Sequence, residues 1–205
     1  MAQELQDKLT PCTAQEMLDA LYVAWVRYFG APPDNTDALR ILLAQWALET
    51  GWGKACHNWN IGNVKAAAGG VYNWQYFRCN EVLNGKIVWF DPPNPGCCFR
   101  AFSTIEDGVL DHLRLLVQHK TFSLAWPAVI TGDPVRYAHV LKMAGYYTAD
   151  EATYAHNVAS LFRTFQKLVP SVSEPMPLVA GIAELSIYSQ QDDILRWERR
   201  TDNEE

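Results

Sequence analysis

The sequence lacks a long hydrophobic run, a secretory signal and a surplus of basic residues. No stretch of its 205 residues reaches the roughly 18 consecutive apolar positions of a membrane-spanning helix, so we expect no membrane span. Residues 1–17 contain neither the basic region nor the apolar segment that signal peptides have. We therefore expect no signal peptide, and a protein that is made in the cytoplasm.

Negative charge is concentrated at the C-terminal end. The chain carries 17 Lys and Arg against 23 Asp and Glu, a net charge of −6. Up to Pro170 the counts are 14 and 15, and the remaining residues hold 3 and 8. A nearly neutral body has no basic surface for a phosphate backbone, so nucleic acid is not an expected partner. The acidic tail is a candidate contact for a protein partner, or it only keeps the chain soluble.

The cysteines do not form the evenly paired pattern of a disulfide framework. There are five of them, and Cys97 and Cys98 are adjacent. Cys79 is placed to meet Cys97 or Cys98 across a hairpin, and buried unpaired thiols are the alternative. The paired C-x-x-C spacing of structural zinc is absent, so we predict no metal site and no cofactor.

Hydrophobic spacing predicts helices on both sides of a central segment rich in glycine, asparagine and proline. A Thr13-x-x-Glu16 capping box begins the first helix, which Gly30 ends. The second helix runs from about Asn35 to Gly51. Its apolar residues form a broad stripe, which predicts a central position in the fold.

The central segment, residues 51–102, is predicted to form a small sheet. β-prone runs at 73–78 and 86–90 flank Asn84-Gly85, which is a strong hairpin signal. Another strand is expected at 98–102.

Four helices are expected after the sheet. The first begins at a Ser103-x-x-Glu106 capping box and the last at a Thr148-x-x-Glu151 capping box. Two shorter helices are expected between them, at 123–131 and 134–144. Three prolines in the eight residues from Pro170 then indicate a linker. We predict an α+β, mainly helical domain at 1–169, followed at 170–205 by this proline-containing linker and the acidic tail.

Glu49 is the strongest candidate for chemistry. It lies in the last turn of the apolar second helix, directly before Thr50-Gly51-Trp52-Gly53-Lys54. The negative end of the helix dipole and water exclusion by Trp46 and Trp52 are both expected to raise its pKa. A carboxylic acid that is still protonated near neutral pH is what a general acid requires. The alternative is a solvated glutamate at a helix end.

Five motifs, in chain order, resemble a known family. The run Ala47-Leu48-Glu49-Thr50-Gly51-Trp52-Gly53-Lys54 resembles the A-L-E-S-G-W-G-K signature of bacterial cell-wall glucosaminidases, glycoside hydrolase family 73 of the lysozyme superfamily. Residues 60–65, 81–85, 99–103 and 142–146 are similar to its N-x-F-G-I-K, E-Y-x-N-G, F-R-x-Y-x-S and K-x-A-G-Y segments. Gly62 and Asn63 replace the Phe-Gly of the second motif.

The resemblance implies a lysozyme-like fold, with a helical lobe, a small β-hairpin lobe and a cleft between them. It implies a peptidoglycan hydrolase that cuts the glycan strand as an endo-β-N-acetylglucosaminidase. By position Glu49 matches the general acid, Glu81 the proposed general base and Tyr146 a tyrosine that orients substrate or stabilises charge. The N-acetyl group of the substrate is an alternative nucleophile, which would make Glu81 less essential.

Aromatic and amide side chains near these motifs are candidate contacts for sugars. Eight tryptophans exceed what a core of this size needs, and such rings often stack on sugar faces. The candidates are Trp52, Trp59, Trp74 and Tyr147 for stacking, and Asn58, Asn60 and Asn63 for hydrogen bonds. Core packing for the aromatic residues and turn formation for the asparagines are the alternatives.

Two other functions remain open at this point. A lytic transglycosylase or muramidase of the same superfamily would share Glu49 and the fold, and a non-catalytic glycan-binding or structural virion module would share the fold alone. Without a signal peptide, an enzyme of this kind is expected to reach the wall as a phage lysin, a virion-borne hydrolase or a secreted effector. We favour the phage lysin.

Overall fold

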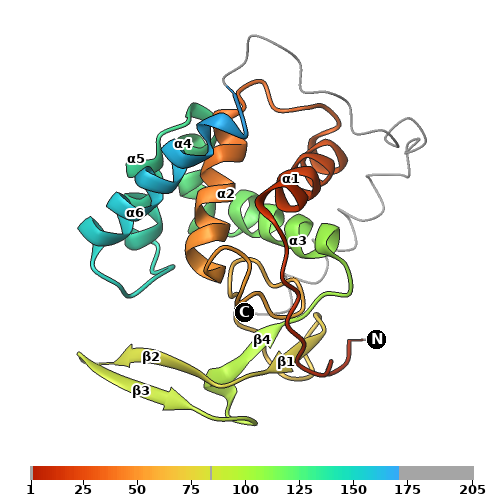
Figure 1. Cartoon of the computed structure of the whole chain (residues 1–205). Helices are drawn as coiled ribbons and strands as arrows, with labels where there is room; N and C mark the ends of the chain where they lie inside the picture. The colour runs from red at the N-terminus through yellow and green to blue at the C-terminus, as the bar shows by residue number, and fades with distance from the viewer. Residues whose placement is uncertain (1, 84, 171–205) are drawn as a thin grey trace. The chain divides into compact units, whose positions relative to one another are not determined.

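The computed structural model describes residues 2–83 and 85–170, which form six α-helices and four short strands (Figure 1). The helices are α1 (Ala14–Phe29), α2 (Asp37–Thr50), α3 (Ile105–Gln118), α4 (Trp126–Thr131), α5 (Pro134–Met143) and α6 (Glu151–Thr164). The strands are β1 (Trp74–Tyr76), β2 (Cys79–Leu83), β3 (Lys86–Phe90) and β4 (Cys98–Arg100). This helix–sheet–helix order is the predicted mainly helical α+β class. The predicted boundary at 169/170 stays a prediction, because nearly all of the proposed tail lies outside the described residues.

Short 3-10 turns link these elements: η1 (Pro95–Cys97) precedes β4, η2 (Phe122–Ala125) precedes α4, and η3 (Phe165–Lys167) follows α6. No helix in the described part of the chain is both long and apolar enough to cross a membrane.

Two of the predicted helix starts are correct and two are displaced. Thr13 caps α1 with the expected capping box, and α2 begins within two residues of Asn35. The caps of α3 and α6 are Thr104 and Asp150, not Ser103 and Thr148. Asp150 is the stronger acceptor, and Lys142 Nζ binds the carbonyl oxygens of residues 148 and 149, which keeps that segment out of the helix.

The hairpin forms at the expected turn, but with a different first strand. β3 pairs with β2, with Glu81 opposite Val88, while β1 pairs with β4 in a separate two-stranded sheet. The run at 73–78 was therefore the wrong partner for 86–90. Pairing across Asn84-Gly85 requires the residues directly before the turn, although Cys79-Asn80-Glu81 has little intrinsic β preference.

Helix α2 is the centre of the helical part, as its apolar stripe predicts. Every residue from Ala38 to Ala47 is buried, and α1, α4 and α6 pack around it. This confinement fixes the direction of the helix, and its C-terminal end points toward the β2–β3 hairpin (Figure 1).

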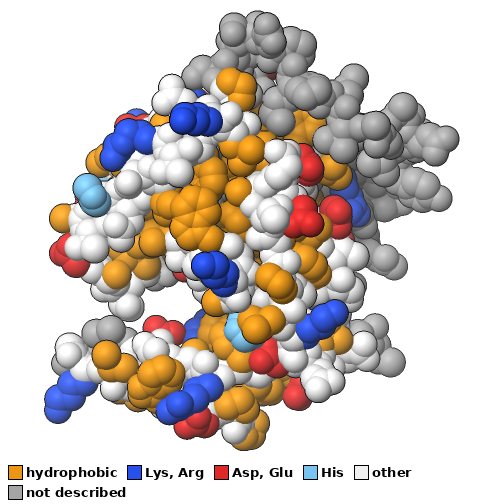
Figure 2. Space-filling view, viewed as in Figure 1, with side chains coloured by type: hydrophobic (Ala, Val, Ile, Leu, Met, Phe, Trp, Pro, Cys, Tyr) orange, Lys and Arg blue, Asp and Glu red, His pale blue; other side chains and the backbone are white. Residues whose placement is uncertain are grey.

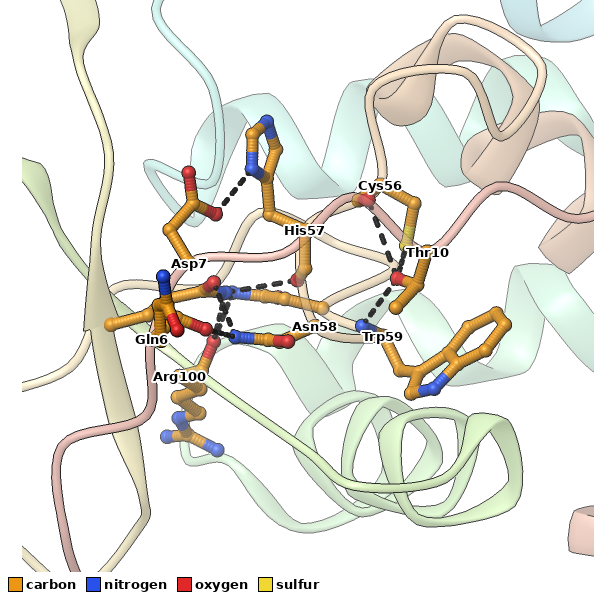
Figure 3. A network of polar contacts seen from close by, with 10 residues as sticks. Gln6, Asp7, Thr10, Cys56, His57, Asn58, Trp59 and Arg100 are labelled. Carbon is orange, nitrogen blue, oxygen red and sulfur yellow. Dashed lines mark hydrogen bonds and ion pairs between the residues drawn. The ribbon is translucent and has the colours of Figure 1, made fainter.

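The N-terminal segment, residues 2–12, runs in extended form between the helices and the sheets. Asn58 Nδ2 donates to the Gln6 carbonyl oxygen at 2.9 Å, and His57 Nδ1 lies 2.6 Å from Asp7 Oδ1 (Figure 3). Thr10 Oγ1 accepts a hydrogen bond from the backbone N–H of Trp59 at 2.9 Å. The segment therefore holds residues 56–59, directly after α2, on one side.

A buried ion pair joins the sheets to α3. Arg100 of β4 donates two hydrogen bonds from Nη1 to the carboxylate of Asp111, at 2.9 and 3.0 Å. Burial raises the pKa of Asp111, and the Arg100 guanidinium acts in the opposite direction. The guanidinium also lies 3.8 Å from the centre of the Tyr72 ring, so its position is determined on two sides.

Removal of Asp111 should destabilise the protein strongly, because it leaves a largely buried Arg100 without its partner. We expect Asp111→Ala to lower the free energy of unfolding by about 3 kcal/mol in urea denaturation. Asp107→Ala, on the same helix but half exposed, is the control and should cost no more than about 1 kcal/mol. Equal losses from the two variants would contradict this account.

Candidate active site

A hollow separates the helices from the β2–β3 hairpin within the described residues (Figure 2). The C-terminal end of α2 is directed to this hollow from the helical side, and the hairpin forms the opposite wall (Figure 1). Glu49 is the last but one residue of α2, and Glu81 is the central residue of β2. The two carboxylates predicted as catalytic therefore belong to elements on opposite sides of the hollow.

Local hydrogen bonds and a left-handed glycine end α2 just after Glu49. Gly51 adopts φ +56°, the left-handed conformation that favours glycine, and so ends the helix. Thr50 Oγ1 donates to the Trp46 carbonyl oxygen at 2.6 Å and accepts from the Gly53 N–H at 2.9 Å. Helix α2 thus stops directly after its carboxylate.

Tyrosines surround the Glu49 carboxyl. The Tyr154 hydroxyl donates to Glu49 Oε1 at 3.0 Å, and Tyr137 and Tyr146 lie near enough to interact electrostatically with it. Part of the Glu49 residue is exposed, yet burial of the carboxyl raises its pKa from an ordinary 4.5 to about 7. The hydrogen bond from Tyr154 acts in the opposite direction. The predicted rise in pKa is therefore present, and burial is its cause.

Tyr154 is a functional candidate that the sequence reasoning missed. It lies four residues before Val158 on α6, and both side chains are buried. Hydrophobic periodicity indicates that the ring is buried, but it gives no information about the hydroxyl group, whose hydrogen-bond partner is 105 residues away. The signal that was available is that a buried tyrosine usually has a hydrogen-bond partner for its hydroxyl.

Tyr147 supports Tyr154, and its predicted contact with a sugar stays a prediction. The two rings stack at 3.7 Å between centroids and 10° between planes. The Tyr147 hydroxyl donates to the Ala138 carbonyl oxygen at 3.0 Å, and Lys142 Nζ lies 5.2 Å from the ring centre. One face of the Tyr147 ring is thus stacked on Tyr154, and its hydroxyl is used by a backbone carbonyl.

Tyr146 is held at the loop that departs from the family motif. Its hydroxyl donates to the Gly62 carbonyl oxygen at 3.1 Å. A side chain at position 62 would lie 2.6 Å from His112 Nδ1 and 2.9 Å from the Tyr146 oxygen, so only glycine fits there. Asn63 adopts φ +49°, a conformation that asparagine tolerates better than most residues. The surroundings therefore accommodate Gly62 and Asn63, the two residues that replace the Phe-Gly of the family motif.

Asn63 anchors the end of α2. Its side-chain amide donates to the carbonyl oxygen of Glu49 at 2.7 Å. This bond uses one of the free carbonyls at the helix C-terminus and connects the loop to the backbone of Glu49 itself. Asn63 was predicted to bind sugar, and in the structure it positions the catalytic candidate.

Asn58 and Asn60 are buried, and their amides are used within the protein. Asn58 Nδ2 donates to Gln6 and to the Gln75 side chain, and Asn60 Nδ2 donates to the carbonyl oxygens of Val64 and Arg100. The prediction that these two amides bind a sugar is therefore not supported. The local bonds of Asn60 to Val64 agree with turn formation, whereas the Asn58 amide binds partners that are distant in the sequence.

The three tryptophans lie in different surroundings. Trp52 is 44% exposed, and its ring packs 5.2 Å from Phe165 after α6. Trp59 is half-buried between the N-terminal segment and α3, where Gly108 contacts its backbone (Figure 3). Trp74 is half-buried on β1, opposite Arg100. The sugar-stacking roles of all three stay predictions.

Glu81 is part of an ion pair at the hairpin wall. Its Oε1 lies 3.1 Å from Lys65 Nζ, and both side chains are partly exposed. Lys65 ends the motif at 60–65 that also contains Asn63. The loop thus contacts both elements that carry the predicted catalytic carboxylates.

The five cysteines all lie in the described part of the chain and are free thiols. Cys79 Sγ donates to the Gly96 carbonyl oxygen at 3.4 Å, instead of joining Cys97 or Cys98 in the disulfide considered above. No group of three or more His, Cys, Asp or Glu side chains among the described residues is arranged to hold a metal ion.

The chain matches the glucosaminidase family, described as mannosyl-glycoprotein endo-beta-N-acetylglucosaminidase, over residues 34–167. The chain belongs to the glucosaminidase family. This confirms the resemblance found in the sequence motifs and the prediction of a glycosidase. The matched region contains Glu49, Glu81 and Tyr146, together with Tyr154 and Lys65.

Curated relatives of this glucosaminidase domain include two peptidoglycan hydrolases named FlgJ. The protein from Vibrio parahaemolyticus is 26% identical over 133 residues, which is 62% of this chain and 41% of that protein. The protein from Pseudomonas aeruginosa is 28% identical over 147 residues, 67% of this chain and 34% of that protein. The chain thus spans well under half the length of the curated relatives that it matches.

Solved structures show the same fold. A peptidoglycan hydrolase mutant from Sphingomonas sp. A1 superposes with a TM-score of 0.55 at 23% identity, over 72% of this chain and 92% of that chain. The catalytic domain of the autolysin Auto from Listeria monocytogenes gives 0.51 at 18% identity, over 77% and 86%. These likenesses agree with the lysozyme-like architecture predicted from the sequence.

Glu49 should show its environment in a direct titration. With ¹³C-labelled glutamate, the wild-type carboxyl signal of Glu49 should titrate with a midpoint near pH 7. Tyr154→Phe removes the hydrogen bond that favours the charged form, so the midpoint should rise. Tyr28→Phe, on α1, is the control and should leave it unchanged. A lower midpoint in Tyr154→Phe would show that the hydroxyl does not stabilise the carboxylate.

The same pKa shift should appear in the stability of the fold. Because the folded state holds the Glu49 proton more tightly than the unfolded state, stability from this group is present at low pH and lost as pH rises through about 7. The loss amounts to about 3 kcal/mol. We therefore expect Glu49→Gln to gain stability relative to wild type between pH 4 and pH 8 in urea denaturation. A constant difference between the two proteins would contradict the raised pKa.

Proposed function

We propose that the chain hydrolyses the glycan strands of peptidoglycan as an endo-β-N-acetylglucosaminidase, with Glu49 as the general acid. The observation that carries this proposal is the Glu49 carboxyl, in the last turn of the helix whose C-terminal end is directed to the hollow, with a pKa of about 7. Family membership gives the reaction class, and the FlgJ relatives, which are named peptidoglycan hydrolases, support the substrate.

Glu49 meets the requirements of a proton donor to a leaving glycosidic oxygen. A carboxyl with a pKa near 7 is largely protonated on the acid side of neutrality and gives up its proton readily. The Tyr154 hydroxyl then stabilises the carboxylate that remains after transfer, because it already donates to Oε1. Burial keeps the pKa of Tyr154 well above 10, so this hydroxyl remains a donor throughout the reaction.

Glu81 is proposed as the second group of the reaction. Glycoside hydrolysis commonly uses a carboxylate to activate water or to stabilise the positive charge that develops at the sugar carbon. Glu81 lies on the hairpin, with the hollow between it and α2, and its Oε1 lies 3.1 Å from Lys65 Nζ. Tyr146, which is half-buried and donates to the Gly62 carbonyl oxygen, is proposed to orient the sugar or stabilise the same charge.

The products of digestion distinguish this proposal from its rivals. Purified peptidoglycan treated with the protein should release fragments with a reducing N-acetylglucosamine end, identified by mass spectrometry. An anhydro end would identify a lytic transglycosylase, and a reducing N-acetylmuramic acid end a muramidase. No release at any pH from 4 to 8 would favour the non-catalytic glycan-binding or virion module.

Glu49→Gln tests the general acid within the same assay. We expect it to lower the rate by about 10²–10⁴-fold, because it removes the transferable proton. Glu106→Gln, an exposed glutamate at the start of α3, is the matched control and should retain the wild-type rate. A Glu49→Gln protein as active as wild type would leave this residue without a catalytic role.

We also retain as proposals the routes to the wall considered above, of which a phage lysin was favoured. The acidic tail as a contact for a protein partner is a further proposal.

A further inference from the structure

We propose that Lys65 is a positioning residue that holds the Glu81 carboxylate in place for the reaction. This inference rests on the proposed role of Glu81. Lys65 belongs to the loop after α2, whereas Glu81 belongs to the hairpin, so their contact is a link between the two sides of the site.

The Lys65 ammonium has a complete set of partners. Nζ lies 3.1 Å from Glu81 Oε1, 2.6 Å from the Gly96 carbonyl oxygen and 3.6 Å from Cys79 Sγ. These three acceptors match the three N–H donors of an ammonium group. The charge also lies 4.0 Å from the centre of the Phe99 ring, within the range of a cation–π contact.

This number of contacts separates the Lys65–Glu81 pair from an ordinary surface ion pair. Exposed pairs contribute little, because both side chains must give up their freedom to form one contact. The Lys65 side chain is already fixed by Gly96 and the Phe99 ring, independently of Glu81. The entropic cost of ordering the Lys65 side chain is therefore shared among several contacts. The remaining N–H of the ammonium then sets the direction from which the Glu81 carboxylate binds.

The support of Lys65 extends to the backbone and to a stack of rings. Lys65 forms a β-bridge with Phe99. The Phe99 ring stacks on Phe77 at 4.2 Å and Phe77 stacks on His57 at 4.0 Å, with interplanar angles of 11° and 10°. His57 contacts Asp7 of the N-terminal segment at 2.6 Å. The Phe99 ring that contacts the ammonium is thus itself held by a series of contacts that extends to the N-terminal segment.

The hairpin needs such a link. Its two strands share no ladder with the β1–β4 sheet, so hydrogen bonding between sheets does not set its position. The ion pair connects β2 to the loop at 60–65, and the same loop binds the end of α2 through Asn63. Lys65 therefore controls where Glu81 lies relative to Glu49.

A double-mutant cycle tests whether Lys65 acts through Glu81. We would measure kcat and KM of wild type, Lys65→Met, Glu81→Gln and the double variant on soluble peptidoglycan oligosaccharides. Lys65→Met should lower kcat by between about tenfold and a hundredfold with little change in KM, as misplacement of a catalytic group does. In the Glu81→Gln background the same change should have no further effect on kcat. Lys65→Arg should recover most of the rate, since it keeps the charge.

Lys86→Met, an exposed lysine of the same hairpin, is the control and should leave kcat and KM unchanged. Circular dichroism spectra of all variants should equal that of wild type, which shows that each retains the fold. If Lys65→Met lowered kcat equally in the wild-type and Glu81→Gln backgrounds, the inference would be overturned. A higher KM at unchanged kcat would also overturn it, because Lys65 would then be a substrate contact.

The failure of this inference is distinguishable from that of the proposed function. A wild-type kcat for Glu81→Gln would remove Glu81 from the reaction and this inference with it. The digestion products and the Glu49→Gln rate would still decide whether the chain is a glucosaminidase.

Discussion

The central constraint of this structure is that one short loop holds both sides of the candidate site. Residues 60–65 donate from Asn63 to the Glu49 carbonyl oxygen at 2.7 Å and from Lys65 to Glu81 at 3.1 Å. Two carboxyls that act on one glycosidic bond need a defined separation, because that separation decides how water or a nucleophile fits between them. A loop that contacts both elements sets this distance more directly than packing between helices and hairpin.

The position of Glu49 is unfavourable for folding and useful for chemistry. Its helix ends at once, its surroundings are tyrosines, and its pKa rises to about 7, so the charged form costs the fold stability. The buried core of α2 offsets this cost. Stability and reactivity are thus separated along one helix: residues 38–47 are buried in the core, and the last turn carries the acid.

Local features of the sequence predicted the helices and the raised pKa of Glu49, because each depends on neighbours in the chain. Periodicity found the six helices, and a glutamate before Gly51 indicated the raised pKa. Long-range partners were beyond such reasoning. From the sequence alone, Asn60 is typical of a turn or of a sugar contact. Only the fold shows that its amide donates to the carbonyl oxygen of Arg100, 40 residues away. The same holds for Tyr154, whose hydroxyl function depends on α2 and α6 lying side by side.

The N-terminal segment extends this constraint beyond the part of the chain that the family shares. Residues 2–12 precede the matched region at 34–167, yet they bind residues 56–59 through backbone and side-chain contacts (Figure 3). Asp7 contacts His57, whose ring begins the stack that ends at Lys65. Because the segment contacts the loop between α2 and the sheets, it restricts the one connection that sets the two carboxyls relative to each other. The two candidate carboxylates lie on different elements, and a two-stranded hairpin is only marginally stable by itself, so the contacts of the N-terminal segment add to the support of the candidate site.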